Sequence, residues 1–129
     1  MRLAGKCAIV TGGASGFGLG IVDKFLAEGA RVMIADINGD SASALAAERG
    51  DAALAQQVDV ANAASVKAMA EAAIAGFGKV DILINNAGVT HLPTPLDEVS
   101  EEDFDRVYHV NMKSVYLTAR ALVPHMKTN

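Results

Sequence analysis

The chain has 129 residues, of which 51% are hydrophobic and 20% charged, and its formal net charge is −4. This composition is that of a globular chain long enough to form one domain with a core of its own, and it excludes an intrinsically disordered polypeptide. A negative net charge gives no electrostatic basis for binding nucleic acid or an anionic membrane surface, so we expect neither partner.

The lengths of the apolar runs and the number of cysteines indicate in which cellular compartment the protein is found. The apolar runs are too short to cross a bilayer, and the N-terminus lacks the apolar segment of a signal peptide. Cys7 is the single cysteine, and its place in an apolar run predicts a buried side chain. A chain without an internal disulfide fits a reducing compartment, so we expect a cytoplasmic protein. The three histidines are too scattered for a ligand cluster, and no metal site is expected.

Strand-like and helix-like segments alternate along the chain. Short apolar runs bounded by turn residues predict strands over residues 7–10, 31–36, 53–59 and 80–85. Apolar residues at helical spacing predict helices over residues 16–28 and 41–48, a third capped by Asn62, and a long fourth opened by Ser100. Asp103 stands three residues after Ser100 and completes a capping box. This alternation predicts an α/β domain in which right-handed crossovers join parallel strands.

The first strand leads into a stretch with four glycines in eight residues, Thr11–Gly18. A strand that ends in a glycine-rich turn and feeds a helix presents free backbone N–H groups at the positive end of the helix dipole, which is a site for a phosphate group. The spacing is neither G-x-G-x-x-G nor that of a P-loop, because Leu19 and Gly20 stand where Lys and Ser or Thr would be needed. The alternative is a tight turn that uses its glycines for geometry alone.

Asp36 ends the second strand, 18 positions after Gly18. In a dinucleotide-binding fold, an acidic residue at about this distance accepts hydrogen bonds from the adenosine ribose hydroxyls. Its carboxylate would repel the 2′-phosphate of NADP, and no Arg or Lys follows in residues 37–39, so we predict NAD as the cofactor. The alternative role for Asp36 is that of an ordinary turn or cap residue.

The motif Asn85-Asn-Ala-Gly88 directly follows the fourth strand. Together with the Thr-Gly-x-x-x-Gly-x-Gly pattern of residues 11–18, it resembles the short-chain dehydrogenase/reductase family, and the resemblance covers nearly the whole chain. It implies a Rossmann-type, doubly wound parallel sheet with four strands in the order 3-2-1-4. It also implies that residues 1–129 form one NAD(P)-binding domain that stops before the family's fifth strand.

The resemblance further implies the residues of a cofactor site and one catalytic residue. The cofactor-binding residues are Gly12, Ser15, Gly16, Phe17, Gly18, Asp36, Ile37, Asp59, Val60, Asn86, Ala87 and Gly88. Among these, the glycines at 12, 16 and 18 form the pyrophosphate turn, and residues 59–60 contact the adenine. Asn111 matches the helix asparagine that helps hold a water molecule in the family's proton relay. Its alternative role is a hydrogen bond at a helix kink or between helices.

The activity implied is hydride transfer between nicotinamide and a small alcohol or ketone, by a homo-oligomer. The family moves the proton with a Ser and a Tyr-x-x-x-Lys pair, in which the lysine lowers the pKa of the tyrosine. Here Tyr108 is followed four residues later by Met112, and Tyr116 by Arg120. Residues 1–129 alone are therefore expected to be inactive.

Two alternatives to that activity remain. One is a non-catalytic dinucleotide-binding module. The other, a methyltransferase, is disfavoured by the Asn-Asn-Ala-Gly motif.

Overall fold

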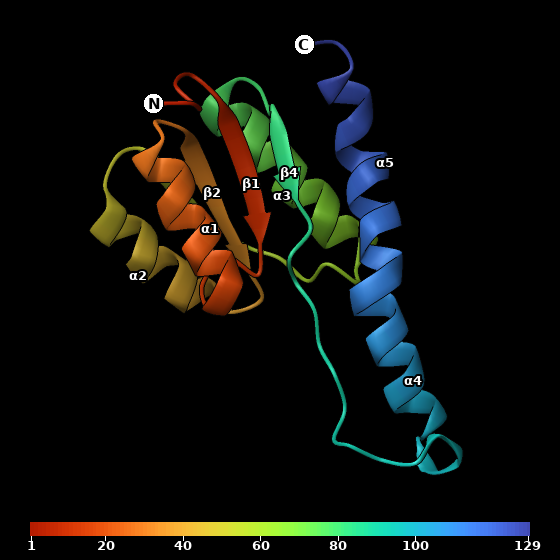
Figure 1. The fold of residues 1–129 in the computed structure, drawn as a ribbon. Coiled ribbons are helices and arrows are strands. Elements are labelled where there is room, and N and C mark those ends of the chain that lie inside the picture. The colour runs from red at the N-terminus through yellow and green to blue at the C-terminus, as the bar shows by residue number, and fades with distance from the viewer.

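The computed structural model describes residues 1–129 and contains one four-stranded parallel sheet with the strand order β3-β2-β1-β4 (Figure 1). The elements in chain order are β1 (Cys7–Thr11), α1 (Gly16–Ala27), β2 (Arg31–Asp36), α2 (Gly39–Arg49), β3 (Ala53–Gln57), α3 (Ala63–Phe77), β4 (Ile82–Ile84), a short 3₁₀ helix (Leu96–Glu98), α4 (Glu101–Tyr108), a π-helical turn (His109–Lys113) and α5 (Ser114–Met126). The predicted Rossmann-type fold and its strand order are confirmed.

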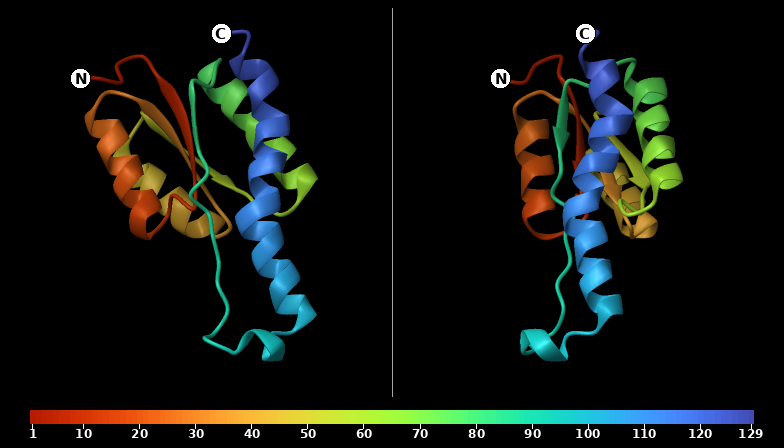
Figure 2. Two further views of the ribbon diagram at one scale, coloured as in Figure 1. Left: turned by 45° about the vertical axis from the view of Figure 1, so that its right-hand side comes forward. Right: turned by 90° about the vertical axis from the view of Figure 1, so that its right-hand side faces the viewer.

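The strands β1 and β2 are buried on both faces, between two layers of helices. Successive residues of a strand point to opposite faces, so neighbouring side chains join different cores. Ile9 and Met33 join the core under α3 and α5, whereas Val10 and Ile34 join the core under α1 and α2. Figure 2 shows these helix pairs on opposite sides of the sheet. Cys7 is buried within the first of these cores, as its apolar context predicts.

Two predicted strands are shorter in the structure, because their ends bond to side chains or turns. The third strand ends at Gln57 rather than at residue 59, since the Asp59 N–H donates to Ser65 Oγ at 2.9 Å. The fourth strand begins at Ile82 rather than at residue 80, and the Val80 N–H donates to His125 Nε2 at 3.3 Å. In both places the backbone turns toward a helix.

The predicted long helix is interrupted. Ser100 caps it as expected, with its Oγ accepting the Asp103 N–H at 3.1 Å. The helix then passes through the π-helical turn His109–Lys113 before α5 begins. Such turns insert one extra residue and often mark functional sites, and hydrophobic periodicity does not reveal them.

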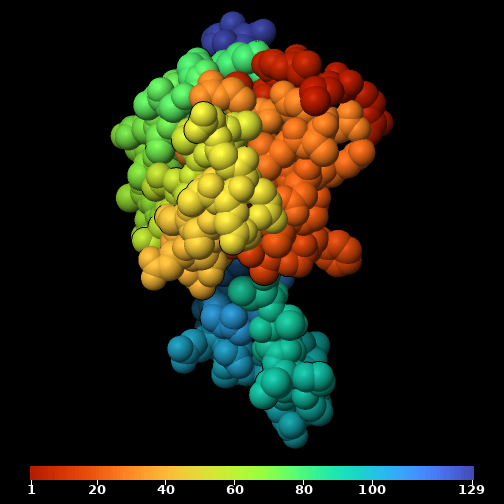
Figure 3. Space-filling view, turned by 90° about the vertical axis from the view of Figure 1, so that its left-hand side faces the viewer, coloured from red at the N-terminus to blue at the C-terminus, as the bar shows by residue number.

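Residues 88–108 form an arm that projects beyond the body of the domain (Figure 3). It consists of the loop after β4, the 3₁₀ helix and α4. The side of α4 and α5 that faces solvent carries large apolar residues, and β4 has a neighbouring strand only on its β1 side. None of the helices has the length and apolar character needed to cross a bilayer.

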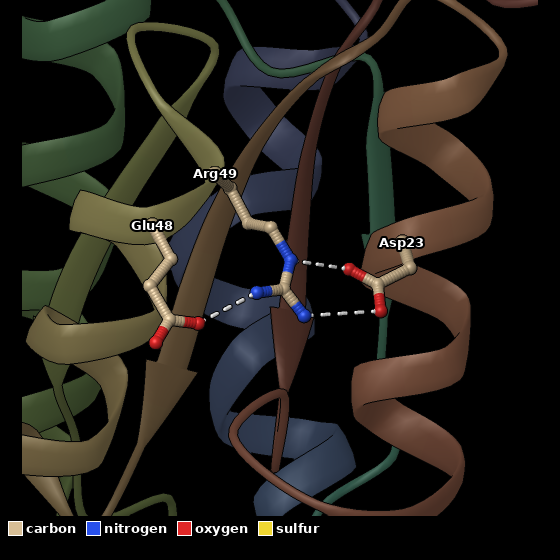
Figure 4. A network of polar contacts seen from close by, with 3 residues as sticks. All are labelled: Asp23, Glu48 and Arg49. Atoms are coloured by element: carbon tan, nitrogen blue, oxygen red, sulfur yellow. Dashed lines mark hydrogen bonds and ion pairs between the residues drawn. The ribbon is translucent and has the colours of Figure 1, made fainter.

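An ion-pair network joins α1 to α2 (Figure 4). The Arg49 guanidinium reaches both carboxylate oxygens of Asp23, with Nε–Oδ1 at 2.8 Å and Nη2–Oδ2 at 3.2 Å, and its Nη1 meets Glu48 Oε2 at 2.9 Å. The hydrogen bond from Arg49 lowers the pKa of Asp23 below its usual value. A bidentate pair of this kind fixes the relative orientation of the two helices that cover one face of the sheet.

Glu28 ties the N-terminal segment to the end of α1. Its carboxylate accepts the Arg2 N–H at 3.0 Å and the Arg2 guanidinium at 3.3 Å, and it lies 2.9 Å from Lys24 Nζ. The backbone hydrogen bond from Arg2, with the contact to Lys24, lowers the pKa of Glu28 to about 2. The carboxylate is therefore charged over a wider pH range in the folded than in the unfolded chain.

We expect Glu28 to make folding stability depend on acid pH. Because its pKa is lowered in the folded state from its usual value of 4.5, its contribution is complete above that value and is lost as pH falls toward about 2. Urea unfolding at several pH values between 5 and 2 should show a smaller loss of stability for Glu28→Gln than for the wild type. Glu71→Gln, at an exposed α3 position, should follow the wild type. Equal pH dependence of the wild type and Glu28→Gln would contradict this assignment.

Candidate functional site

A pocket of about 450 Å³ lies at the carboxyl ends of the strands, where the chain crosses from β1 to neighbours on either side. In open parallel sheets, ligands bind at this topological switch point. The pocket is lined by Gly12, Ser15, Phe17, Asp36, Ile37, Val58, Asp59, Val60, Asn86, Ala87, Gly88, Val89 and Val110. All the predicted cofactor-binding residues except Gly16 and Gly18 are in this lining.

The glycine loop needs its glycines for two different physical reasons. Gly12 and Gly16 have φ values of +63° and +56°, in the left-handed region that side chains disfavour. Gly18 has an ordinary φ, but a Cβ there would lie 2.0 Å from the carbonyl oxygen of Gly12. Gly18 thus permits α1 to approach the end of β1 and shapes the pocket without lining it.

Helix α1 begins at this loop without a side-chain cap. Ser15 occupies the N-cap position, but its side chain caps no backbone N–H, and the first turn of α1 contains no acidic residue. By contrast, Asn38 caps α2 through its side chain, and Asp40 lies in the first turn of that helix. The first turn of α1 therefore suits a bound anion.

Asp36 lines the pocket at the end of β2 and is only 9% exposed. Its Oδ2 accepts the Ala14 N–H at 3.0 Å, and its Oδ1 accepts the Asn38 N–H at 3.0 Å. The carboxylate therefore joins the glycine loop to the turn before α2. Each carboxylate oxygen has a second acceptor site, so these bonds leave Asp36 able to accept hydrogen bonds from ligand hydroxyls.

Thr11 is the site residue to which the sequence assigned no role of its own. Its side chain is 1% exposed, and its Oγ1 accepts the N–H groups of Asn86 at 3.0 Å and Ala87 at 3.1 Å while donating to the Ile84 carbonyl at 3.3 Å. The Asn86 side chain donates in return to the carbonyls of Thr11 and Gly12, at 3.1 and 3.2 Å. These bonds lock the loop after β4 against the glycine loop. The sequence feature that could have indicated this role is a threonine at the end of a strand whose other residues are apolar.

Asn111 lies in the π-helical turn and does not line the pocket, although its neighbour Val110 does. Its Oδ1 accepts the Val89 N–H at 2.8 Å, and its Nδ2 donates to the Val89 carbonyl at 2.7 Å. This amide therefore holds the loop that follows Gly88. Its proposed part in a proton relay stays a prediction.

The remaining polar candidates lie away from the pocket. Neither Tyr108 nor Tyr116 is among its lining residues, and no lysine is. The Tyr116 hydroxyl accepts a hydrogen bond from Arg120 at 3.0 Å, on the exposed side of α5. No group of three or more His, Cys, Asp or Glu side chains is arranged to hold a metal ion.

Gly18→Ala should strongly destabilise the domain, because its Cβ would also lie 2.5 Å from Asn86 Nδ2 and α1 would have to move. Steric overpacking of this kind costs roughly 1–3 kcal/mol or more. Gly20→Ala is the matched control in the same helix, where a Cβ meets nothing within 4 Å. It should stabilise the fold by roughly 0.5–1 kcal/mol through helix propensity. Denaturant midpoints measure both effects, and a Gly18→Ala midpoint at or above that of the wild type would refute the close contact.

Comparisons with known proteins agree with this geometry. A model of the family described as short chain dehydrogenase matches residues 6–129. A 4-formylbenzenesulfonate dehydrogenase of Comamonas testosteroni is 46% identical over 128 residues, which cover 97% of this chain and 51% of that protein. A 2-dehydro-3-deoxy-L-rhamnonate dehydrogenase (NAD(+)) of a Sphingomonas species is 43% identical, with 99% of this chain and 51% of that protein covered.

Solved structures give the same result. The crystal structure of a 3-ketoacyl-(acyl-carrier-protein) reductase from Brucella melitensis complexed with NADH superposes with a TM-score of 0.96 at 49% identity, over 98% of this chain and 52% of that one. The chain thus spans about half the length of the curated relatives it matches. A pocket at the switch point, built on the Thr-Gly-x-x-x-Gly-x-Gly and Asn-Asn-Ala-Gly motifs, and a family match over residues 6–129 show that this chain belongs to the short chain dehydrogenase family.

Proposed function

We propose that residues 1–129 bind NAD and supply the cofactor-binding part of a dehydrogenase that acts on small alcohols or ketones. The observation that carries this proposal is the pocket itself, in which an uncapped helix N-terminus and the Asp36 carboxylate face one cavity. The helix N-terminus suits a pyrophosphate, and the Asp36 carboxylate suits a ribose. The relatives' names, which include two dehydrogenases and a reductase, support the reaction class.

The lining residues fit the parts of a dinucleotide. Gly12 lacks the Cβ that would narrow the floor of the pocket, and a Cβ there would already lie 2.9 Å from Asn86 Nδ2. Phe17 and Ile37 are 91% and 63% exposed at the pocket, and this apolar surface suits a ligand with flat apolar faces. Asp59 and Val60, which follow β3, are the residues we assign to the adenine.

The chemistry divides between cofactor and protein. When bound, the nicotinamide carries the hydride. The pocket's own residues bind and orient the cofactor, and none of them is a tyrosine or lysine that could exchange a proton with a substrate oxygen. We assign that proton transfer to groups outside residues 1–129.

We also propose that the protein is located in the cytoplasm. Its one cysteine, Cys7, is buried and forms no disulfide, which is consistent with a reducing compartment.

Asp36→Asn should weaken NADH binding about tenfold or more, because hydrogen bonds to a charged group contribute roughly 1.5–3 kcal/mol. It should also narrow the preference for NADH over NADPH, since the repulsion of a 2′-phosphate is removed. Titration can follow the fluorescence of the bound reduced nicotinamide. Asp40→Asn makes the same change at an exposed position outside the pocket and should leave both affinities unchanged.

Thermal unfolding of Asp36→Asn separates loss of the ligand contact from loss of the Ala14 and Asn38 contacts. The proposal predicts weaker binding at temperatures where the variant remains folded. Wild-type protein that fails to bind NADH, or that binds NADPH more tightly, would overturn the assignment of NAD.

We also propose that the chain self-associates through the solvent face of α4 and α5. Phe104, Tyr108, Met112, Val115 and Tyr116 are all exposed there at helical spacing. Light scattering should give a mass above the 13.3 kDa of one chain. Met112→Glu should lower that mass, whereas Ala68→Glu on the exposed face of α3 should not. A wild-type monomer at high concentration would contradict this proposal.

A further inference from the structure

Three polar side chains spaced seven residues apart attach the long helix to β4 and its flanks. Thr118 and His125 are about two turns apart on one face of α5, and Asn111 lies in the π-helical turn that precedes it. Asn111 bonds to Val89 beyond the strand, Thr118 Oγ1 donates to Asn85 Oδ1 at 2.8 Å, and His125 Nε2 accepts the Val80 N–H. Figure 1 shows α5 running beside β4 along this length.

These contacts matter because β4 is short, and they add to the hydrogen bonds by which Thr11 and Asn86 hold its carboxyl end. It has only three residues, and its backbone ladder runs to β1 alone. Asn85 follows directly and is exposed along the open edge of the sheet. Thr118, by contrast, is fully buried, and its hydroxyl donates to the nearer Asn85 Oδ1 at 2.8 Å, with the Val115 carbonyl as a second acceptor at 3.2 Å.

The consecutive residues Asn85 and Asn86 face opposite ways, as successive side chains of an extended segment do. Asn85 turns to α5, where it meets Thr118, while Asn86 turns to the glycine loop and donates to the carbonyls of Thr11 and Gly12. The pair therefore connects the long helix to the floor of the pocket. Asn85 and Asn86 share a peptide bond, so a change at Asn85 acts directly on a residue that lines the pocket.

We propose that Thr118 is a positioning residue for the pocket: its buried hydroxyl fixes Asn85 and so holds Asn86, Ala87 and Gly88 against the glycine loop. That the pocket's ligand is a dinucleotide rests on the proposed function. The effect on the loop itself does not depend on the ligand. His125 makes its contact at the opposite end of β4, so it stabilises the fold without shaping the pocket.

The test measures amide hydrogen exchange and NADH affinity in the same variants. In Thr118→Val, which keeps the shape and removes the donor, the N–H groups of Asn86 and Ala87 should exchange faster, and the Kd for NADH should rise about three- to tenfold. Thr118→Ser keeps the hydroxyl and should restore both properties. His125→Leu should lower the unfolding temperature but leave loop exchange and Kd unchanged.

Asn85→Ala removes the same contact from an exposed position and should reproduce the Thr118→Val result, even if the latter proves too unstable to study. Combining Asn85→Ala with Thr118→Val should add nothing further, because the two changes break one interaction. Equal loop exchange in the wild type, Thr118→Val and Asn85→Ala would overturn the role of Thr118. A wild type that does not bind NADH would instead overturn the proposed function, while the exchange data would still decide the role of Thr118.

Discussion

The close contact between Gly18 and the carbonyl of Gly12 is the constraint on which the site depends. It brings the first turn of α1 against the end of β1, where no side chain of any size could stand between them. The Gly12 carbonyl also accepts from Asn86, so the same atom fixes the loop after β4. Because Gly18 can lie so close to Gly12, the uncapped N-terminus of α1 is placed next to the end of β1. A side chain at position 18 would push these two elements apart and so change the shape of the pocket.

The sheet and most helices could be predicted from the sequence because their signals are local. Runs such as residues 32–35 are apolar throughout, as expected of a strand buried on both faces. The predicted caps at Asn62 and Ser100 are equally local, since each side chain accepts an N–H three residues ahead. What the sequence could not show are contacts between distant residues. The bonds of Thr11 to Asn86 and Ala87 cross 75 and 76 positions, and no periodicity announces them.

The same reasoning explains the elements that differ from prediction. Asp59 and Val80 lie beside strand-like segments in the sequence. Their N–H groups, however, donate to Ser65 and His125 and do not continue the backbone hydrogen bonds of the sheet. The π-helical turn is invisible to a hydrophobic pattern because it shifts the helix face by one residue without changing its composition. Its effect is to place the Asn111 amide against both backbone groups of Val89. In this chain, the departures from regular structure lie at the points where α3, α4 and α5 meet the carboxyl and amino ends of strands.

Asp36 shows why cofactor choice and loop geometry are coupled in this pocket. Its two oxygens hold Ala14 in the glycine loop and Asn38 before α2, while the same carboxylate faces the cavity. A basic residue at this position would attract a 2′-phosphate, but it could accept neither N–H group. Two backbone donors beside a nearly buried site would then lose their partner. A substitution at position 36 that was meant to change cofactor preference would therefore loosen the glycine loop, to which we assign the pyrophosphate. A basic residue placed after Asp36, at exposed Ile37, would leave that loop intact.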